Sequence, residues 1–213
     1  SANQQYSHLS KAKNIIESIV GPIEAFRAPA LRIGYQTPQI LQELGFKTDS
    51  SISSQRFDGP MSFGSIKKLN WIFSPRKPYL MNINNPYKRG NSSVLEVPVS
   101  ALFLAYMGTT LRISPALTKI LENFLFYECK FFDRPLVFLF HPTEIIDDVL
   151  YRKYVRRNKS YINYLFKDVI RRKLKLKNLG NNASNLLELL LKEHVKKGVN
   201  FVTMKDFRKK WLK

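Results

Sequence analysis

The chain has 213 residues, of which 35 are Lys or Arg and 16 are Asp or Glu, giving a formal net charge of +19. Hydrophobic residues make up 44% of the chain and aromatic residues 13%, which excludes wholesale disorder and supplies enough apolar surface for a packed core. The single cysteine, Cys129, excludes an internal disulfide framework and a metal site built from several thiolates, and it predicts a small buried side chain.

The first part of the chain predicts alternating helices and strands. An apolar stripe from Leu9 to Val20 predicts a helix that ends at Gly21-Pro22. A short strand is expected at residues 23–26, followed by a helix over 37–44 and an extended segment at 46–48. This order of elements favours an α/β fold.

The same alternation continues to the end of the chain. Residues 54–93 are rich in Pro, Gly and Asn and predict a long loop with short ordered pieces, a kind of segment that usually carries function. Beyond the loop, the pattern predicts strands at 94–99, 136–140 and 201–204, a helix capped by Ser114-Pro115, and a helix from Leu186 to Val195. The 136–140 run is wholly apolar, as expected for a parallel strand buried on both faces.

Three polar side chains follow predicted strands directly. Arg27, Asp49 and His141 come at or just after the ends of three such segments. Because ligand sites of parallel sheets lie at the carboxyl ends of the strands, we expect these side chains to converge on one rim. Each residue alone also has a structural explanation, namely an ion pair for the Arg, a turn or helix cap for the Asp, and a packed ring for the His.

The positive charge is concentrated near the C-terminus. Residues 1–150 carry a net charge of +4, and residues 151–213 carry +15. Such a density of Lys and Arg favours a polyanion or an anionic membrane surface as partner. The alternative is a solvated basic helix whose apolar side chains cover a core. The partner hypothesis rests on Arg152, Lys153, Arg156, Arg157, Arg171 and Arg172, within the basic segment 151–177.

Four short motifs, in order, resemble the polysaccharide deacetylase family, apparently its C-terminal part. They are Phe26-Arg27-Ala28-Pro29, the run from Leu44 to Ile52 with Asp49-Ser50-Ser51, Leu95-Glu96-Val97-Pro98, and Phe138-Leu139-Phe140-His141-Pro142. The segment from Lys197 to Met204 is similar to the closing segment of the family, and Ser74-Pro75-Arg76-Lys77-Pro78 to a loop of its prokaryotic members. The resemblance covers about residues 11–148 and 186–213.

The resemblance implies a distorted seven-stranded (β/α) barrel that hydrolyses N-acetyl groups on an amino-sugar polymer with a divalent metal, zinc being the expected one. It implies that His141 is the general acid, that Arg27 orients the catalytic base, and that Asp49 pairs with the acid histidine and keeps it protonated. Trp71 and Pro29 would contact the sugar. Glu144 could reach the same rim or could cap a helix.

The chain also departs from the family pattern. It contains no Thr-Phe-Asp-Asp-Gly segment, which would supply the base and one metal ligand, and no His-x-x-x-His pair for the other two ligands. The Gln4 to His8 spacing imitates that pair only superficially, and His8 and His194 are expected to be structural or exposed. Either the first half of a longer deacetylase precedes these residues, or the protein is a catalytically inactive, carbohydrate-binding relative. A polyanion or membrane-surface binder is the remaining alternative.

For the organisation of the chain, the sequence predicts a single deacetylase-like domain over residues 1–213 that is incomplete at its N-terminal side. Residues 149–185 form a basic helical insertion or flank within it. No apolar run is long enough to span a bilayer, and the polar start Ser1 to Gln5 is unlike a signal peptide, which together favour a cytoplasmic or membrane-peripheral protein. A homo-oligomer is compatible with these observations.

Overall fold

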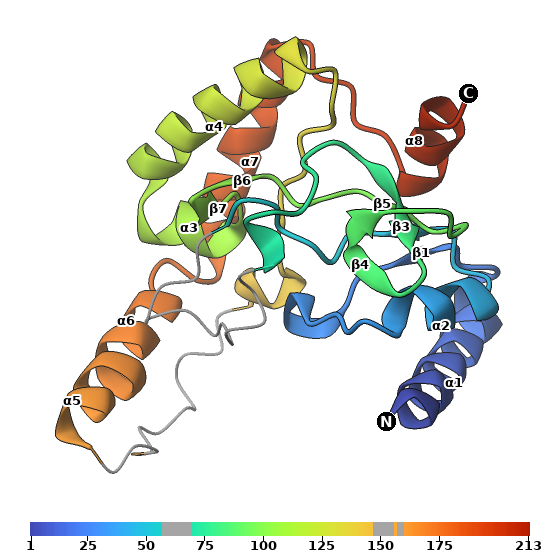
Figure 1. The fold of residues 1–213 in the computed structure, drawn as a ribbon. Coiled ribbons are helices and arrows are strands. Elements are labelled where there is room, and N and C mark those ends of the chain that lie inside the picture. Colours follow the sequence, from blue (N-terminus) through green and yellow to red (C-terminus); the bar gives the residue numbers. More distant parts are fainter. Residues whose placement is uncertain (57–69, 147–155, 157–159) are drawn as a thin grey trace.

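A computed structural model of the chain describes residues 1–56, 70–146, 156 and 160–213. Its centre is a five-stranded mixed sheet with the strand order β1-β2-β5-β3-β4 (Figure 1). The parallel part consists of β1 (Ala25–Phe26), β2 (Thr48–Asp49) and β5 (Leu95–Glu96), while β3 (Tyr79–Asn82) and β4 (Asn85–Arg89) continue it in antiparallel pairing. The α/β class is therefore confirmed. The described strands form an open sheet, so the closed barrel stays a prediction.

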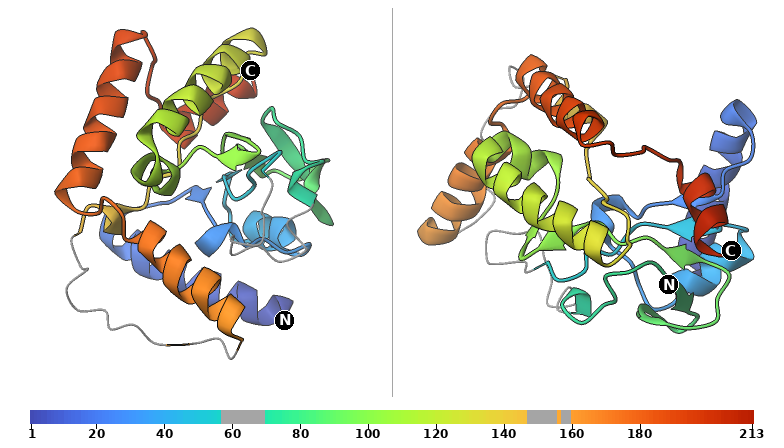
Figure 2. Two further views of the ribbon diagram at one scale, coloured as in Figure 1. Left: turned by 90° about the vertical axis from the view of Figure 1, so that its left-hand side faces the viewer. Right: turned by 90° about the horizontal axis from the view of Figure 1, so that it is seen from above.

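Helices surround this sheet on several sides. Helices α1 (Ala2–Val20) and α2 (Thr37–Glu43) lie near β1, and α8 (Met204–Trp211) packs by β2. Helices α4 (Pro115–Phe131) and α7 (Asn181–Lys196) lie side by side at the far end of the molecule, next to α3 (Gly108–Ile113) (Figures 1 and 2). The remaining short elements are η1 (Pro29–Leu31), η3 (Pro142–Glu144), β6 (Ala101–Leu102) and β7 (Leu104–Ala105).

Local capping signals located the end of α1 and the start of α4 correctly. Helix α1 ends where Gly21 adopts a left-handed φ of 79°, a conformation that favours glycine. At the start of α4, the Ser114 hydroxyl accepts a hydrogen bond from the Leu117 amide at 3.4 Å, and Pro115 occupies the first turn. Helix α4 also carries Cys129, which is 6% exposed, as its sequence context predicted.

The 54–93 segment, predicted as a loop with short ordered pieces, contains the β3–β4 hairpin, and its residues 57–69 lie outside the described part of the chain. Two strand predictions need correction. The 136–140 segment lies beside residues 100–108 but forms only one parallel bridge, Met107 to Leu139, within the described chain. Residues 201–203 form no strand, and α8 begins at Met204 instead, because the Thr203 hydroxyl caps that helix by accepting from the Asp206 amide.

The buried apolar residues form two clusters. The larger lies around the sheet and includes Leu41, Trp71, Met81 and Leu95, and the smaller joins α3, α4 and α7 through Leu111, Leu125 and Leu190. The apolar stripe of α1 is largely exposed in the described structure, with Ile19 at 77%. Within the described residues, no helix is both long enough and apolar enough to cross a membrane.

A helical projection leaves the body beyond η3. It consists of α5 (Tyr161–Asn163), a π-helical stretch η5 (Tyr164–Ile170) and α6 (Arg171–Lys175), which follow one another without a break. We call residues 160–177 the basic arm. Figure 1 shows it extending away from the sheet, and the view from above in Figure 2 also separates it from α1. The helical character expected for the basic segment is thus present in its described part, whereas Arg152, Lys153 and Arg157 lie outside the described residues.

Candidate functional site

The candidate site lies where β1 and β2 end side by side. Because these two strands are parallel neighbours, with Phe26 opposite Asp49, the residues that follow both strands emerge at the same edge of the sheet. Arg27 donates from Nε to the Ser50 carbonyl oxygen at 2.9 Å and from Nη2 to the Ser50 hydroxyl at 2.8 Å. Its side chain is exposed. The two strand ends therefore hold a surface guanidinium in a fixed orientation.

A relay of hydrogen bonds connects the same motif to Asp49. The Ala28 amide donates to Ser51 Oγ at 2.8 Å, and the Ser51 hydroxyl donates to Asp49 Oδ1. The Ser50 amide also donates to Asp49 Oδ1, at 2.8 Å. The structure thus brings together Arg27 and Asp49, as predicted from their positions at the strand ends. Asp49 itself is fully buried, at 0% exposure.

The partner of Asp49 is Glu96, a residue that the sequence analysis did not assign to the site. Glu96 lies opposite Asp49 in the parallel register of β2 and β5, and it is also 0% exposed. Its Oε1 accepts from the Ile52 amide at 2.9 Å. The signal that could have found it is an acidic residue inside an apolar strand, Leu95-Glu96-Val97, since a buried carboxyl group requires a partner.

A proton shared between Asp49 and Glu96 explains how two carboxyl groups can be buried side by side. Burial raises the pKa of Asp49 to about 6, against the lowering effect of hydrogen bonds from Ser51, Glu96 and Ser50 and of the Arg27 charge. The pKa of Glu96 is raised well above its ordinary value, first by burial and then by the charge of Asp49. Without that proton, Asp49 Oδ2 and Glu96 Oε2 would be buried with no donor. Glu96 is therefore the protonated member and donates to Asp49.

His141 lies directly before η3. Its Nδ1 lies 2.8 Å from Thr143 Oγ1, at the start of η3, and the ring is exposed. Among the contacts of the described residues, Asp49 bonds to the Ser50 amide, the Ser51 hydroxyl and Glu96, and not to His141. The expected pairing of Asp49 with the acid histidine is thus not seen in this structure, and the general-acid role of His141 stays a prediction.

The two residues expected to contact a sugar differ in accessibility. Pro29 is exposed at the start of η1, directly beyond Arg27 and Ala28. Trp71 is only 1% exposed and packs in the larger core cluster, with the Arg56 guanidinium 5.5 Å from its ring centroid. A substrate would reach the Trp71 ring only after its neighbours moved. Pro29 is therefore the better placed of the two for contact with a ligand.

Glu144 forms an ion pair and does not cap a helix. Its Oε2 lies 2.8 Å from Arg112 Nε, and both side chains are largely buried, at 12% and 4% exposure. The backbone carbonyl of Glu144 accepts from the Gly180 amide at 3.0 Å. This residue therefore ties η3 to α3 and to the start of α7, which is a structural role.

A second buried polar cluster lies between α4 and α7. Glu122 is 1% exposed, and its Oε1 lies 2.6 Å from Lys197 Nζ and 3.6 Å from His194 Nε2. The other ring nitrogen of His194 bonds to the Leu190 carbonyl at 2.8 Å, and Tyr106 Oη lies 3.4 Å from Nε2. His194 is thus a packed helix residue, as the sequence analysis expected. The cluster joins the two helices and offers no surface to a substrate.

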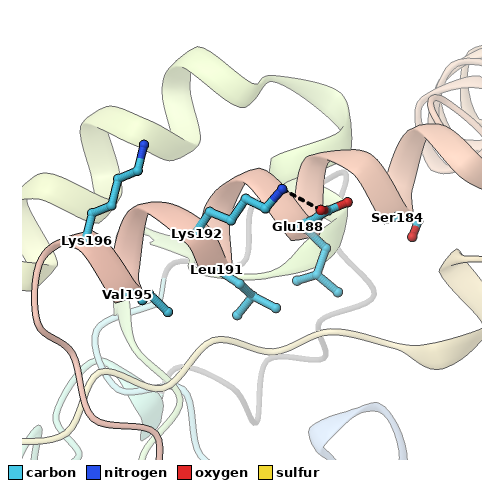
Figure 3. A pocket seen from close by; sticks show the side chains of 7 residues that line it. Ser184, Glu188, Leu191, Lys192, Val195 and Lys196 are labelled. Atoms are coloured by element: carbon cyan, nitrogen blue, oxygen red, sulfur yellow. Dashed lines mark ion pairs between the residues drawn. The ribbon is translucent and has the colours of Figure 1, made fainter.

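A hollow on the molecular surface lies apart from these polar groups. It has a volume of about 540 Å³ and runs along one face of α7, lined by Ser184, Leu187, Glu188, Leu191, Lys192, Val195 and Lys196. Figure 3 shows Leu191 and Val195 projecting into the open space beneath the helix, with Glu188 and Lys192 forming an ion pair above them. None of its lining residues belongs to the strand-end site.

The divalent metal implied by the sequence motifs does not fit the donor groups that the structure describes. Within the described residues, no cluster of three His, Cys, Asp or Glu side chains could hold a metal ion. The carboxyl groups of Asp49 and Glu96 lie close together, but they are closed to solvent and accept hydrogen bonds from backbone amides. Among the residues that the structure describes, the expected zinc ion therefore has no set of ligands, and no chemical step is assigned to a metal.

Comparison with known proteins gives one distant structural likeness. No protein-family model matches the chain, and no curated protein is significantly similar to it. A crystal structure from Mycobacterium smegmatis, provisionally described as a polysaccharide deacetylase, shares 19% sequence identity over 67% of this chain and 44% of its own, with a TM-score of 0.44. The chain thus spans less than half of the length of that neighbour. The fold class, α/β with a mixed sheet, is established by the strands themselves.

Proposed function

We propose that the protein is a relative of the polysaccharide deacetylases that acts on an acetylated amino-sugar polymer. The ordered sequence motifs support this proposal. The observation that carries it is the contact between two of them, because Arg27 and the Asp49-Ser50-Ser51 run meet at the ends of adjacent parallel strands. Motifs that are distant in the sequence and yet joined by three hydrogen bonds behave as parts of one site.

The proposed role of Arg27 follows from its own hydrogen bonds. Nε and Nη2 are bound to Ser50, and among the contacts of the described residues Nη1 has no acceptor. An exposed guanidinium with one free edge can bind a carboxylate and lower its pKa, as a positive charge that orients a catalytic base must do. The Asp49–Glu96 pair lies beneath this position and fixes the backbone that carries it. We therefore assign Asp49 a positioning role.

Hydrolysis of the N-acetyl group would require a metal-binding and base-bearing segment in addition to the residues described. An acetate-release assay on N-acetylglucosamine oligomers with added Zn²⁺, using the protein isolated from its source cells, tests the proposal directly. Activity is expected, and Arg27→Ala and His141→Ala should each lower kcat by about a hundredfold or more. Replacement of the exposed Lys209 on α8 by Ala is the matched control and should leave the activity unchanged.

The intact mass of that isolated protein separates two explanations of the incomplete motifs. A mass above that of these 213 residues would be consistent with an additional segment that supplies the ligands. Failure to release acetate at any concentration of Zn²⁺ would contradict the catalytic proposal.

A catalytically inactive, carbohydrate-binding relative is the second candidate. It is favoured by the lack of a possible metal cluster among the described residues. This candidate predicts that acetylated oligosaccharide binds without release of acetate, and that Arg27→Ala weakens the binding. Isothermal titration with N-acetylated and deacetylated oligomers distinguishes the two candidates, because only an enzyme converts the first ligand into the second.

A further inference from the structure

The basic arm, residues 160–177, carries an apolar stripe that nothing in the described structure covers. Tyr161 and Ile162 are 70% and 68% exposed, and Leu165 and Phe166, about one helical turn later, are 38% and 48% exposed. These residues repeat at the spacing that places side chains on one face of a helix. A row of four large exposed apolar side chains on one short projection is unusual for the surface of a soluble monomer and indicates a binding surface.

The same arm is strongly cationic. Residues 160–177 contain six Lys and Arg residues and one Asp, a net charge of +5. Lys173 and Lys175 are exposed on α6, near the base of the arm. Arg156, just before the arm, places its guanidinium 5.1 Å from the centre of the Tyr164 ring, which adds another cation beside the stripe. The arm therefore combines an apolar face with a dense positive charge.

The base of the arm is fixed to the body of the protein. Arg112 of α3, which is 3% exposed, donates from Nη1 to the carbonyl oxygens of Lys175 at 2.8 Å and Lys177 at 2.6 Å. In return, Lys177 Nζ donates to the Ile113 carbonyl at 2.8 Å and Asn178 Nδ2 to the Arg112 carbonyl at 2.8 Å. These reciprocal bonds attach the C-terminal end of the arm to α3.

We infer that the basic arm docks the protein on an anionic lipid surface, with Tyr161, Ile162, Leu165 and Phe166 inserted at the level of the acyl chains. Interfacial helices of this kind bury apolar side chains at the boundary of the headgroups, while Lys and Arg contact anionic headgroups. Long basic side chains can extend from the buried face to the headgroup level. The inference goes beyond the proposed carbohydrate function and does not depend on it.

Two other occupants fit the arm less well. The phosphates of a nucleic acid could bind the positive charges, and its bases could stack on Tyr161 and Phe166. Its backbone, however, gives Ile162 and Leu165 no apolar environment. A second copy of the chain could cover the stripe, but it would bring two arms of charge +5 together, which like-charge repulsion opposes. A bilayer with anionic headgroups satisfies both the apolar face and the charge.

Vesicle co-sedimentation of the full chain tests the inference. The protein is expected to bind phosphatidylcholine vesicles that contain phosphatidylserine, to bind pure phosphatidylcholine weakly, and to lose affinity as salt is raised. The double variant Ile162→Ser with Phe166→Ser should weaken binding about tenfold or more, because it removes buried apolar area. Lys173→Glu with Lys175→Glu should weaken binding to the anionic vesicles about tenfold or more.

Matched variants elsewhere on the surface make the result specific to the arm. Phe201→Ser with Val202→Ser removes side chains that are 60% and 61% exposed, and Lys209→Glu with Lys210→Glu makes the same change of charge on α8. Both controls should bind within about twofold of the unmodified protein. Unchanged circular dichroism would show that the arm variants are folded, as expected for exposed positions.

Each contrary outcome overturns the inference. If the arm variants bind vesicles as well as the unmodified protein does, or if the controls lose as much affinity, the arm is not the docking element. Binding of DNA that depends on Lys173 and Lys175 but not on Ile162 and Phe166, without binding to vesicles, would assign the arm to a nucleic acid. A dimer in analytical ultracentrifugation that Ile162→Ser with Phe166→Ser converts to a monomer would assign the stripe to a second copy.

Discussion

Asp49 and Glu96 face each other across the parallel register of β2 and β5, and both carboxyl groups are fully buried. They belong to segments that meet only when the sheet forms. Their shared proton joins the two strands beneath the exposed Arg27, so the candidate site is supported by an interaction that depends on pH. This relationship gives a prediction for the stability of the fold.

The free energy of unfolding should fall as pH rises from about 4 to above 6. The pKa of Asp49 is raised to about 6 from its ordinary value of 3.8, so within this window the folded protein retains a proton that the unfolded chain has released. The folded state then binds more protons, and its stability decreases with rising pH. The raised pKa of Glu96 extends the decrease to higher pH.

Glu96→Gln should remove the part of this decrease that lies above pH 6, where Glu96 itself would release its proton, while the part caused by the buried Asp49 remains. The amide retains an oxygen for the Ile52 amide and donates to Asp49 through its NH₂ group at every pH. At pH 8 we expect the variant to be more stable than the unmodified protein, as measured by urea denaturation. Glu43→Gln, on the exposed surface of α2, is the control and should leave the pH profile unchanged. An unmodified protein whose stability rises over this pH range would contradict the shared-proton assignment.

Arg112 should contribute far more to stability than an exposed partner in an ion pair does. Arg112→Ala leaves the Glu144 carboxylate largely buried without its cation and removes two bonds to the base of the basic arm. We expect a loss of about 3 kcal/mol in the free energy of unfolding. Lys119→Ala breaks the pair of Lys119 and Glu193, in which both side chains are well exposed, and should change the free energy of unfolding far less. Equal losses in the two variants would refute the structural role of the buried pair.

Helices and capping residues could be predicted because their signals are local. The stripe of α1 and the Ser114-Pro115 cap of α4 depend on residues only a few positions apart. The meeting of Arg27 with Asp49 was also predictable, because neighbouring parallel strands have a fixed direction and end at a common edge.

Long-range pairing could not be predicted in the same way. The β3–β4 hairpin turns at Asn82 to Asn85 without a glycine, so its sequence resembles a loop, and residues 201–203 have strand character but no partner strand in the described structure. Glu96 was missed because its partner, Asp49, lies far away in the sequence. The closed barrel depended on the family resemblance and not on local signals, and it remains untested.

The β3–β4 hairpin should be intolerant of a side chain at Gly90. A Cβ atom there would lie 2.3 Å from the Cα atom of Asn82 and 2.8 Å from its backbone nitrogen, so the two strands would have to separate. We expect Gly90→Ala to lower the free energy of unfolding by about 2 kcal/mol. Gly34→Ala is the matched control, because its Cβ would meet only Thr37 Oγ1 at 3.7 Å, an ordinary contact. A Gly90→Ala variant as stable as Gly34→Ala would show that the hairpin does not pack as described.

Truncation of two adjacent residues on α4 should change the stability by very different amounts. Leu125 is 0% exposed and belongs to the smaller core cluster. Phe124 is 63% exposed and lies outside that cluster. Leu125→Ala should cost about 3 kcal/mol, because it removes buried apolar area and leaves a cavity between α4 and α7. Phe124→Ala should change the unfolding free energy by less than about 0.5 kcal/mol in the isolated chain. A large loss on Phe124→Ala would mean that the apolar outer face of α4 is covered in solution, and thermal denaturation at two protein concentrations would then tell whether a second copy covers it.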